Sequence, residues 1–266
     1  MKYFDAHCHL QFEGYDADRD SLIARMRDEG VGGIVVGVDR ASIDGALSIA
    51  EAHEHIYASV GLHPNDTLHE VFDEAFMRVC AAHPRVVAIG ECGLDYFRPE
   101  NLEQAKQKQQ EVFWQHIELA VQMNKPLMIH ARPSKGTMDA YEDALGMLEE
   151  AKREHPGLRG DFHFFVGDTT IAKRILELDF TMSFTAVLTF THDYDDVVRY
   201  VPLTHLLSET DAPFVAPASR RGERNDPFAV RDVVRAIAQI REEDEEAVRQ
   251  AILENARTLF QVADQG

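Results

Sequence analysis

The sequence is poor in cysteine and has no long hydrophobic run. Three cysteines in 266 residues cannot build a disulfide framework, which excludes the small disulfide-stapled secreted proteins. No apolar run approaches the ~18 residues of a membrane span, and the first residues, MKYFDAHCHL, lack the apolar stretch of a signal peptide. We therefore expect a protein of the reducing cytoplasm with no membrane partner.

Positive charge is also scarce. The chain has 27 basic and 46 acidic residues, a formal net charge of −19. A surface with this balance repels polyphosphates at long range, so charge alone argues against a nucleic-acid partner. The 13 histidines point to another chemistry, because histidine is the commonest metal ligand and a frequent acid–base group.

The chain also lacks internal repeats, low-complexity stretches and Ser/Gly/Pro-rich linkers, so we expect a single domain over residues 1–266. With 45% apolar and 27% charged residues it is too apolar for a disordered protein. Short apolar runs alternate with longer amphipathic segments, the pattern of strands alternating with helices.

Eight runs are apolar on both faces, as buried parallel strands are. The expected strands are Lys2–His7, Val31–Val38, Ile56–Leu62, Val86–Glu91, Pro126–His130, Arg159–Phe164, Phe180–Thr185 and Leu206–Thr210. The clearest helical patterns are Ser21–Glu29, Leu102–Met123, Asp226–Ile240 and Glu242–Gln261. Eight strands alternating with helices over about 250 residues predict an α/β fold of the (β/α)8 TIM-barrel type. An open doubly wound sheet is the main alternative.

Polar side chains interrupt or follow these strands at their carboxyl ends. They are His7, His9, His63, Glu91, His130, His163 and Asp211. In a barrel those ends converge on one face, where active sites form. Histidines with carboxylates are a typical ligand set for transition metals, and two carboxylates are enough for two ions.

The spacing of the first histidines favours a shared ion. Residues at i and i+2 of an extended segment project to the same side, so His7 and His9 can reach one ion while Cys8 points away and packs. The alternative is two surface histidines near the chain start. Glu91 follows an apolar strand, where an unpartnered carboxylate is costly, and its two oxygens could bridge two ions.

His130 and His163 each end an apolar strand. Either alone would be read as a core histidine, but on adjacent strands they favour a second ion site. Asp211 could be a buried turn cap. As the acidic group after the last strand, it is the expected general base or acid beside the metals.

His63 and Arg132 are expected to bind substrate rather than metal, and the planar guanidinium of Arg132 suits phosphate or carboxylate. Arg220, Arg221 and Arg224 form the clearest basic cluster of an acidic chain. We expect this cluster to assist weak substrate binding, with a solvated surface loop as the alternative.

In their order along the chain, several motifs together resemble the TatD family of metal-dependent deoxyribonucleases. The motifs are DAHCHL, SVGLHP, GECGLDY, IHAR, ETDAP, RRGERNDP and NARTLF, and they run from Asp5 to Phe260. The resemblance implies a (β/α)8 barrel, a divalent-metal site and hydrolysis of DNA phosphodiesters, typically as an exonuclease from the 3′ end. It implies DNA, single-stranded or at 3′ ends, as substrate, and no obligate protein partner.

Carried over by position, the resemblance implies two metal sites. His7, His9, Glu91 and Asp211 match the first site, and Glu91, His130 and His163 match the second. His63 and Arg132 match positions expected to contact phosphate.

The chain departs from the family pattern on the sixth strand. The family usually reads H-C-F-S-G there, whereas this chain reads His163–Phe164–Phe165–Val166–Gly167 and lacks the small hydroxyl. Gln11 stands where Asp, Asn or Thr is common. These changes are expected to affect the pocket wall, and hence the substrate, more than the metal ligands.

The expected mechanism is two-metal hydrolysis with Glu91 and Asp211 as catalytic carboxylates. Glu91 bridges two divalent ions (Zn, Mn, Ni, Fe or Mg), and Asp211 orients and deprotonates the attacking water. The main rival is an amidohydrolase-like enzyme that cleaves a small-molecule ester, lactone or amide with the same metals. A third reading is a metal-bound scaffold without turnover.

Overall fold

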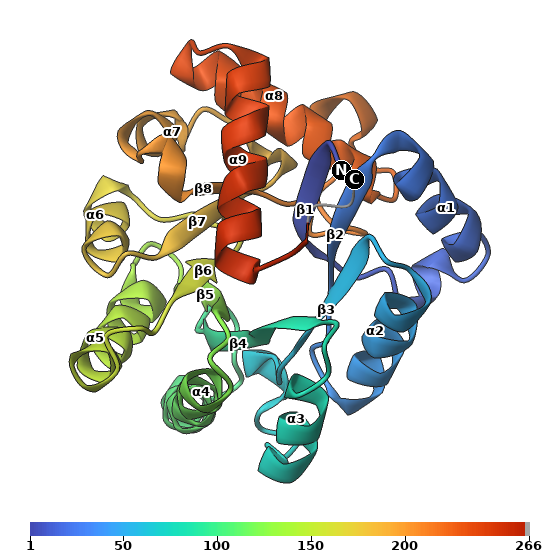
Figure 1. Ribbon diagram of the computed structural model, residues 1–266. Coiled ribbons are helices and arrows are strands. Elements are labelled where there is room, and N and C mark those ends of the chain that lie inside the picture. The colour runs from blue at the N-terminus through green and yellow to red at the C-terminus, as the bar shows by residue number, and fades with distance from the viewer. Residues whose placement is uncertain (264–266) are drawn as a thin grey trace.

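The computed structural model describes residues 1–263, and its centre is a sheet of eight parallel strands in the order β1 to β8. Each strand pairs with the next along the chain, and helices surround the sheet (Figure 1). This is the predicted (β/α)8 barrel. The strands are β1 Tyr3–Cys8, β2 Val31–Val36, β3 Ile56–Val60, β4 Val86–Asp95, β5 Leu127–Arg132, β6 Gly160–Phe162, β7 Thr181–Phe184 and β8 Leu206–Ser208.

All eight predicted strands are present, with ends that differ by a few residues. The largest difference is β4, which continues to Asp95, four residues beyond the predicted end at Glu91. Every residue of β2, β3 and β4 is buried, which explains why these strands read as continuous apolar runs.

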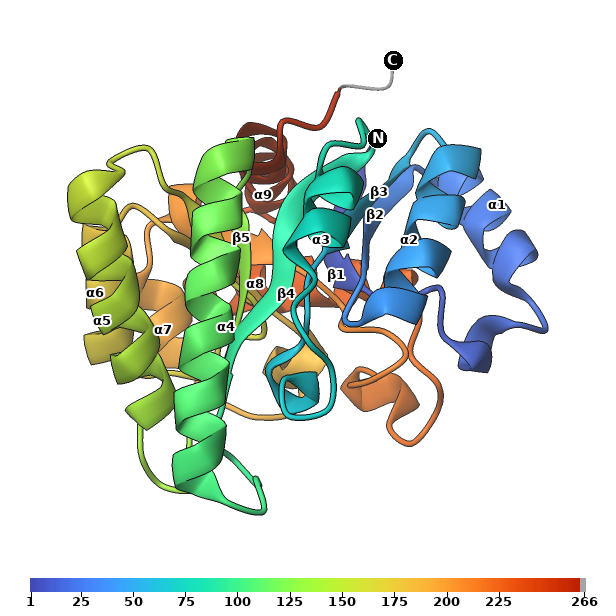
Figure 2. The ribbon, with the colours of Figure 1, turned by 90° about the horizontal axis from the view of Figure 1, so that it is seen from below.

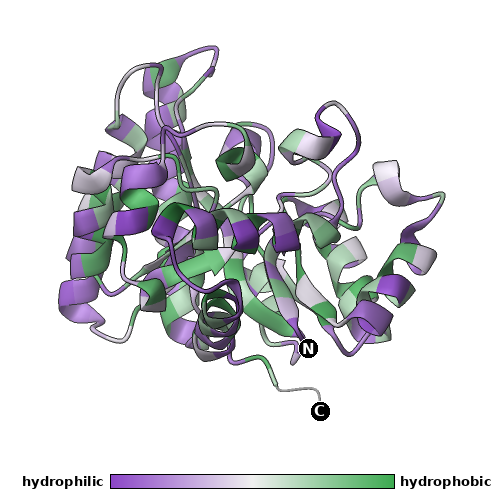
Figure 3. Ribbon diagram, turned by 90° about the horizontal axis from the view of Figure 1, so that it is seen from above, coloured by the Kyte–Doolittle hydropathy of each residue, from purple (hydrophilic) through white to green (hydrophobic). Residues whose placement is uncertain are grey.

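The helices form the outer layer and alternate with the strands. They are α1 Arg19–Glu29, α2 Arg40–Ala52, α3 Glu74–Ala81, α4 Leu102–Met123, α5 Asp139–Glu154, α6 Thr169–Glu177, α7 Asp195–Tyr200, α8 Val230–Arg241 and α9 Glu245–Phe260. The predicted range of α4 is confirmed residue for residue. Within residues 1–263, no helix is long and apolar enough to span a membrane, and polar and apolar residues alternate around the outer helices (Figure 3).

The two ends of the barrel differ. Helix α9 lies across the end where the strands begin (Figure 1). Its last residue, Phe260, packs against Phe4 of β1. In Figure 2, the loop from β4 into α4 lies on the side opposite the N-terminus. The carboxyl ends of the strands therefore face the uncovered side, where a cavity opens.

The barrel closes differently between β8 and β1. Among the described residues these strands share no ladder, and a single isolated bridge joins Cys8 to Ala212. The buried carboxylate of Asp5 completes the seam, accepting hydrogen bonds from the amide of Thr210 at 2.8 Å and from its hydroxyl at 2.5 Å. The amide of Asp211 donates to the carbonyl of His7 at 2.9 Å. Hydrogen bonds to the side chain of Asp5 thus help to hold β8 against β1.

Candidate metal centre

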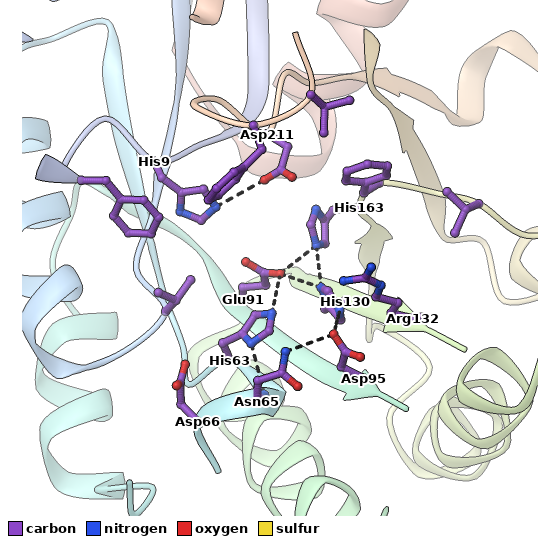
Figure 4. Close-up of a pocket in the computed structure, with 17 residues that line it drawn as sticks. His9, His63, Asn65, Asp66, Glu91, Asp95, His130, Arg132, His163 and Asp211 are labelled. Carbon is purple, nitrogen blue, oxygen red and sulfur yellow. Dashed lines mark hydrogen bonds and ion pairs between the residues drawn. The ribbon is translucent and has the colours of Figure 1, made fainter. Parts of the chain in front are cut away.

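A cavity of about 640 Å³ opens at the carboxyl ends of the strands. Its polar lining comes from elements far apart in the sequence, and Figure 4 shows these side chains converging on one another. The polar residues are His9, His63, Asn65, Asp66, Glu91, Asp95, His130, Arg132, His163 and Asp211. The strand-end residues predicted to meet therefore do meet, with His7 buried directly behind them.

The first group of donor atoms straddles the seam between β1 and β8. The Nε2 atoms of His7 and His9 lie 3.1 Å apart, and Asp211 Oδ1 lies 3.4 Å from His9 Nε2 and 3.8 Å from His7 Nε2. His9 Nδ1 is 3.2 Å from the carbonyl oxygen of Val36. Because a carbonyl only accepts, Nδ1 carries the hydrogen and the lone pair of Nε2 is directed toward the group.

Glu91 connects this group to a second one. Its Oε1 lies 2.8 Å from His130 Nδ1 and 2.9 Å from His163 Nε2, while its Oε2 lies 3.4 Å from His7 Nε2. Burial opposes ionisation of Glu91, but the charges of His163, His63 and His7 and the hydrogen bond with His130 hold its pKa well below the usual range. A buried carboxylate whose two oxygens face two different sets of histidines is placed to bridge two ions.

A third group contains a residue that sequence reasoning left outside the site. Asp95 Oδ2 lies 3.1 Å from His130 Nε2, and His63, expected to bind substrate, lies beside them close enough to share an ion. Burial alone would raise the pKa of Asp95, yet His130, the amide of Phe97 and the charge of Arg132 lower it to about 2. The sequence could have indicated Asp95, because it lies an even number of residues after Glu91 in GECGLDY. Side chains with that spacing project from the same face of a strand.

The model of the TatD related DNase family matches residues 4–261. The chain belongs to the TatD family. YabD of Bacillus subtilis is 38% identical over 97% of this chain and 99% of its own, and YcfH of Escherichia coli is 34% identical over 98% and 97%. Both are named only as metal-dependent hydrolases.

Solved structures agree with this assignment. The TatD homologue YjjV of Escherichia coli superposes with a TM-score of 0.87 at 27% identity, covering 98% of this chain and 99% of its own. A dihydroorotase of Campylobacter jejuni, at a TM-score of 0.59 and 13% identity over 100% of this chain and 84% of its own, shares the fold alone. This TatD-family chain is therefore a metal-dependent hydrolase by descent.

The donor spacing in this TatD-family site fits divalent transition ions. Tetrahedral ligands with bonds of ~2.0–2.1 Å lie roughly 3.3 Å from one another. The nitrogen pairs His7–His9 and His130–His163 are 3.1 and 3.2 Å apart. Imidazole and carboxylate donors also suit such ions chemically.

Buried carboxylates behind the site were missed from sequence. Glu209 Oε1 accepts a hydrogen bond from the amide of Phe164 at 2.8 Å and lies 3.4 Å from His163 Nδ1. The hydroxyl of Ser183 lies 2.6 Å from Glu209 Oε2 and 2.6 Å from Asp161 Oδ2. Burial, with the charge of Glu209, raises the pKa of Asp161 to about 7. Glu209 thus lies directly behind His163, and Ser183 links it to Asp161, in the manner of outer-shell partners in metal sites.

The backbone around the cavity is strained. Phe164, Asp211 and Val215 line the cavity with φ angles of 47°, 51° and 53°, in the left-handed region that side-chain-bearing residues avoid. Gly93 has a φ of 130°, and a Cβ there would collide with the carbonyl oxygen of His130. Strain of this kind persists where the surrounding structure fixes side chains for function.

Other predicted features lie outside the cavity lining. Arg220 and Arg224 form ion pairs with Asp226 and Asp18 at 2.9 and 2.6 Å, and Arg221 lies over the ring of Phe190. Gln11 donates to the carbonyl of Val36 at 2.6 Å and does not line the cavity, whereas Val166 and Arg132 do. The basic cluster is thus largely engaged with its own neighbours.

Proposed function

We propose that this TatD-family protein is a deoxyribonuclease that cleaves phosphodiester bonds from the 3′ end of single-stranded DNA with two divalent ions. The observation that carries the proposal is the position of Glu91, whose Oε1 faces His130 and His163 and whose Oε2 faces His7. Such a bridging carboxylate supports a two-ion site of the kind used for in-line phosphoryl displacement.

In this proposal the residues divide into two ligand sets. His7, His9 and Asp211 would hold one ion, and His130 and His163 would hold the other, with Glu91 placed between the two sets. Divalent ions bound there would act as Lewis acids on the phosphate and lower the pKa of water. Asp95 orients His130 through Nε2, as a carboxylate behind a ligating histidine does.

The remaining groups act on the substrate. Asp211, partly open to the cavity, takes the proton of the attacking water as the oxygen–phosphorus bond forms and the bond to the O3′ leaving atom breaks. His63 and the exposed guanidinium of Arg132 contact the non-bridging phosphate oxygens. O3′ takes up a proton from solvent.

The acidic surface supports a preference for chain ends. A net charge of −19 gives little attraction for a duplex laid along the surface, whereas a flexible single-stranded end can enter the cavity. Any such end would be bound weakly and released readily. We also propose a cytoplasmic location, because the free cysteines Cys8, Cys80 and Cys92 suit a reducing compartment.

The test is a DNA digestion assay after chelation, with Mg, Mn, Zn, Ni or Fe added back singly. The substrates are 5′-labelled oligonucleotides with a free or a blocked 3′ end. We expect metal-dependent shortening of the free-ended substrate, loss of it in Asp211→Asn, and no loss in Asp196→Asn, an exposed control carboxylate. A parallel panel of lactones, amides and chromogenic phosphodiesters tests the rival small-molecule hydrolase. Turnover confined to lactones or amides would overturn the proposal.

A further inference from the structure

One wall of the cavity is apolar and has no part in holding metal or phosphate. It consists of Phe12, Val38, Phe164, Val166, Phe214 and Val215. Phe214 is 51% exposed although it lies three residues after Asp211. Contiguous apolar surface rimmed by polar residues is typical of a ligand-binding groove.

The aromatic rings of this wall are arranged around His9. The ring of Phe12 lies parallel to the His9 ring, with centroids 4.6 Å apart and an interplanar angle of 9°. Phe214 stands edge-on to Phe12, with centroids 6.4 Å apart and an angle of 71°. His9 covers one face of the Phe12 ring, whereas Phe214 remains largely open to the cavity.

The loop that carries Phe214 is anchored on both sides. The amide of Phe214 donates to the carbonyl of Asp211 at 2.8 Å. The buried side chain of Asn225 donates to the carbonyls of Thr210 and Val215, at 3.1 and 3.2 Å. The strained backbone of Val215 is therefore fixed, and the ring is presented without the entropy cost of ordering a mobile loop.

We propose that Phe214, backed by Phe12, stacks against the nucleobase of the nucleotide whose phosphate is cleaved. This inference rests on the proposed function. Figure 4 places His9 and Arg132 at opposite sides of the cavity. A phosphate bound between Arg132 and the ions would therefore leave the aromatic wall beside His9 free for the base. Base stacking tolerates any sequence, because every base has a flat π-face. It also requires no positive charge, which suits a chain of net charge −19.

The first test is equilibrium binding by calorimetry on the metal-loaded protein. Thymidine 5′-monophosphate is compared with 1,2-dideoxyribose 5-phosphate, which has the same sugar phosphate without the base. We expect the nucleotide to bind about 5- to 100-fold tighter, and Phe214→Ala to remove that preference while the sugar phosphate binds unchanged. Phe214→Leu should lose most of it, because leucine keeps apolar area but has no flat face.

Phe190→Ala is the matched control, because Phe190 is 42% exposed and lies outside the cavity lining. Equal binding of the two ligands by the unaltered protein, or an equal loss for both in Phe214→Ala, would overturn the stacking proposal. A base preference in a protein that cleaves no DNA would refute the deoxyribonuclease proposal and leave the stacking site standing.

Discussion

Glu91 Oε2 lies 3.4 Å from His7 Nε2, so strands β1 and β4, which are not neighbours in the sheet, meet at one carboxylate. Both side chains are buried. The contact joins the donor group at the barrel seam to His130 and His163, which lie 2.8 and 2.9 Å from the other oxygen of Glu91. Glu91 is therefore the residue on which a two-ion arrangement depends.

Replacement of Glu91 by glutamine tests that dependence. The amide retains the size of the side chain but removes the negative charge, so we expect bound metal to fall from about two ions to about one per chain. Hydrolysis should fall at least about 100-fold, since even outer-shell partners of metal ligands cost 10–100-fold. Elemental analysis of purified protein measures the first effect. Undiminished metal content in Glu91→Gln would rule out the bridging role.

Asp95 should act through His130. In Asp95→Asn the hydrogen bond to His130 Nε2 loses its charge, so we expect metal affinity to fall by about 10- to 100-fold with the fold intact. Competition with a coloured chelator measures the affinity. Asp139→Asn is a suitable control, because Asp139 accepts hydrogen bonds from Ser134 away from the cavity lining. Equal affinities in the two variants would argue against an orienting role for Asp95.

His116 should make the fold sensitive to acid. It lies buried in α4, accepts a hydrogen bond from the amide of Leu62, and burial lowers its pKa to about 4 despite the bond to the carbonyl of Val112. The unfolded chain, with a histidine pKa near 6.5, binds the proton first, so stability falls as the pH drops from about 6.5 to 4. The loss from His116 at pH 4.5 is about 2–3 kcal/mol.

Urea unfolding at pH 7 and pH 4.5 measures this contribution. His116→Gln keeps an acceptor for Leu62 but cannot be protonated, so its acid loss should be smaller by that amount. His192→Gln, at an exposed histidine, should behave like the unaltered protein. A pH dependence that is the same in all three proteins would contradict the assignment to His116.

The seam offers a test of stability. Thr210→Val removes the hydroxyl that donates to Asp5, leaving a buried carboxylate oxygen without that partner. We expect the free energy of unfolding to fall by about 1–3 kcal/mol. Thr170→Val, at an exposed threonine of α6, should change it by less than about 0.5 kcal/mol. Equal stabilities would show that the seam does not depend on this contact.

Much of this architecture could be predicted because parallel strands buried on both faces have continuous apolar sequences. The same rule explains the misplaced end of β4, where Gly90, Gly93 and the polar Glu91 and Asp95 interrupt the apolar run. The strand-end histidines were recognisable because a barrel brings such ends together. The way these residues divide into donor groups could not be predicted, because His63, Asp95 and His130 come together from separate strands.

The residues behind the site were harder to foresee. Glu209 and Asp161 are buried carboxylates whose partner, Ser183, lies on another strand. Both lie inside expected buried strands, Arg159–Phe164 and Leu206–Thr210, and that position was the available signal, but their partner on a third strand could not be foreseen. Asp226, the partner of Arg220, lies only six residues along the chain, whereas Asp18, the partner of Arg224, is brought near by folding, so the full charge balance of that cluster could not be judged from its own segment.

Because β8 pairs incompletely with β1, we expect the stability of the barrel to depend on bound metal. An ion held by His7, His9 and Asp211 would link the ends of the first and last strands, where backbone pairing is incomplete. Without metal, local unfolding should begin at this seam. In a hydrogen-exchange measurement on the metal-free protein, the amide hydrogens of β1 and β8 should exchange faster than those of β4 and β5. Loss of the ion would then lower both the activity of the enzyme and the local stability of its closing strands.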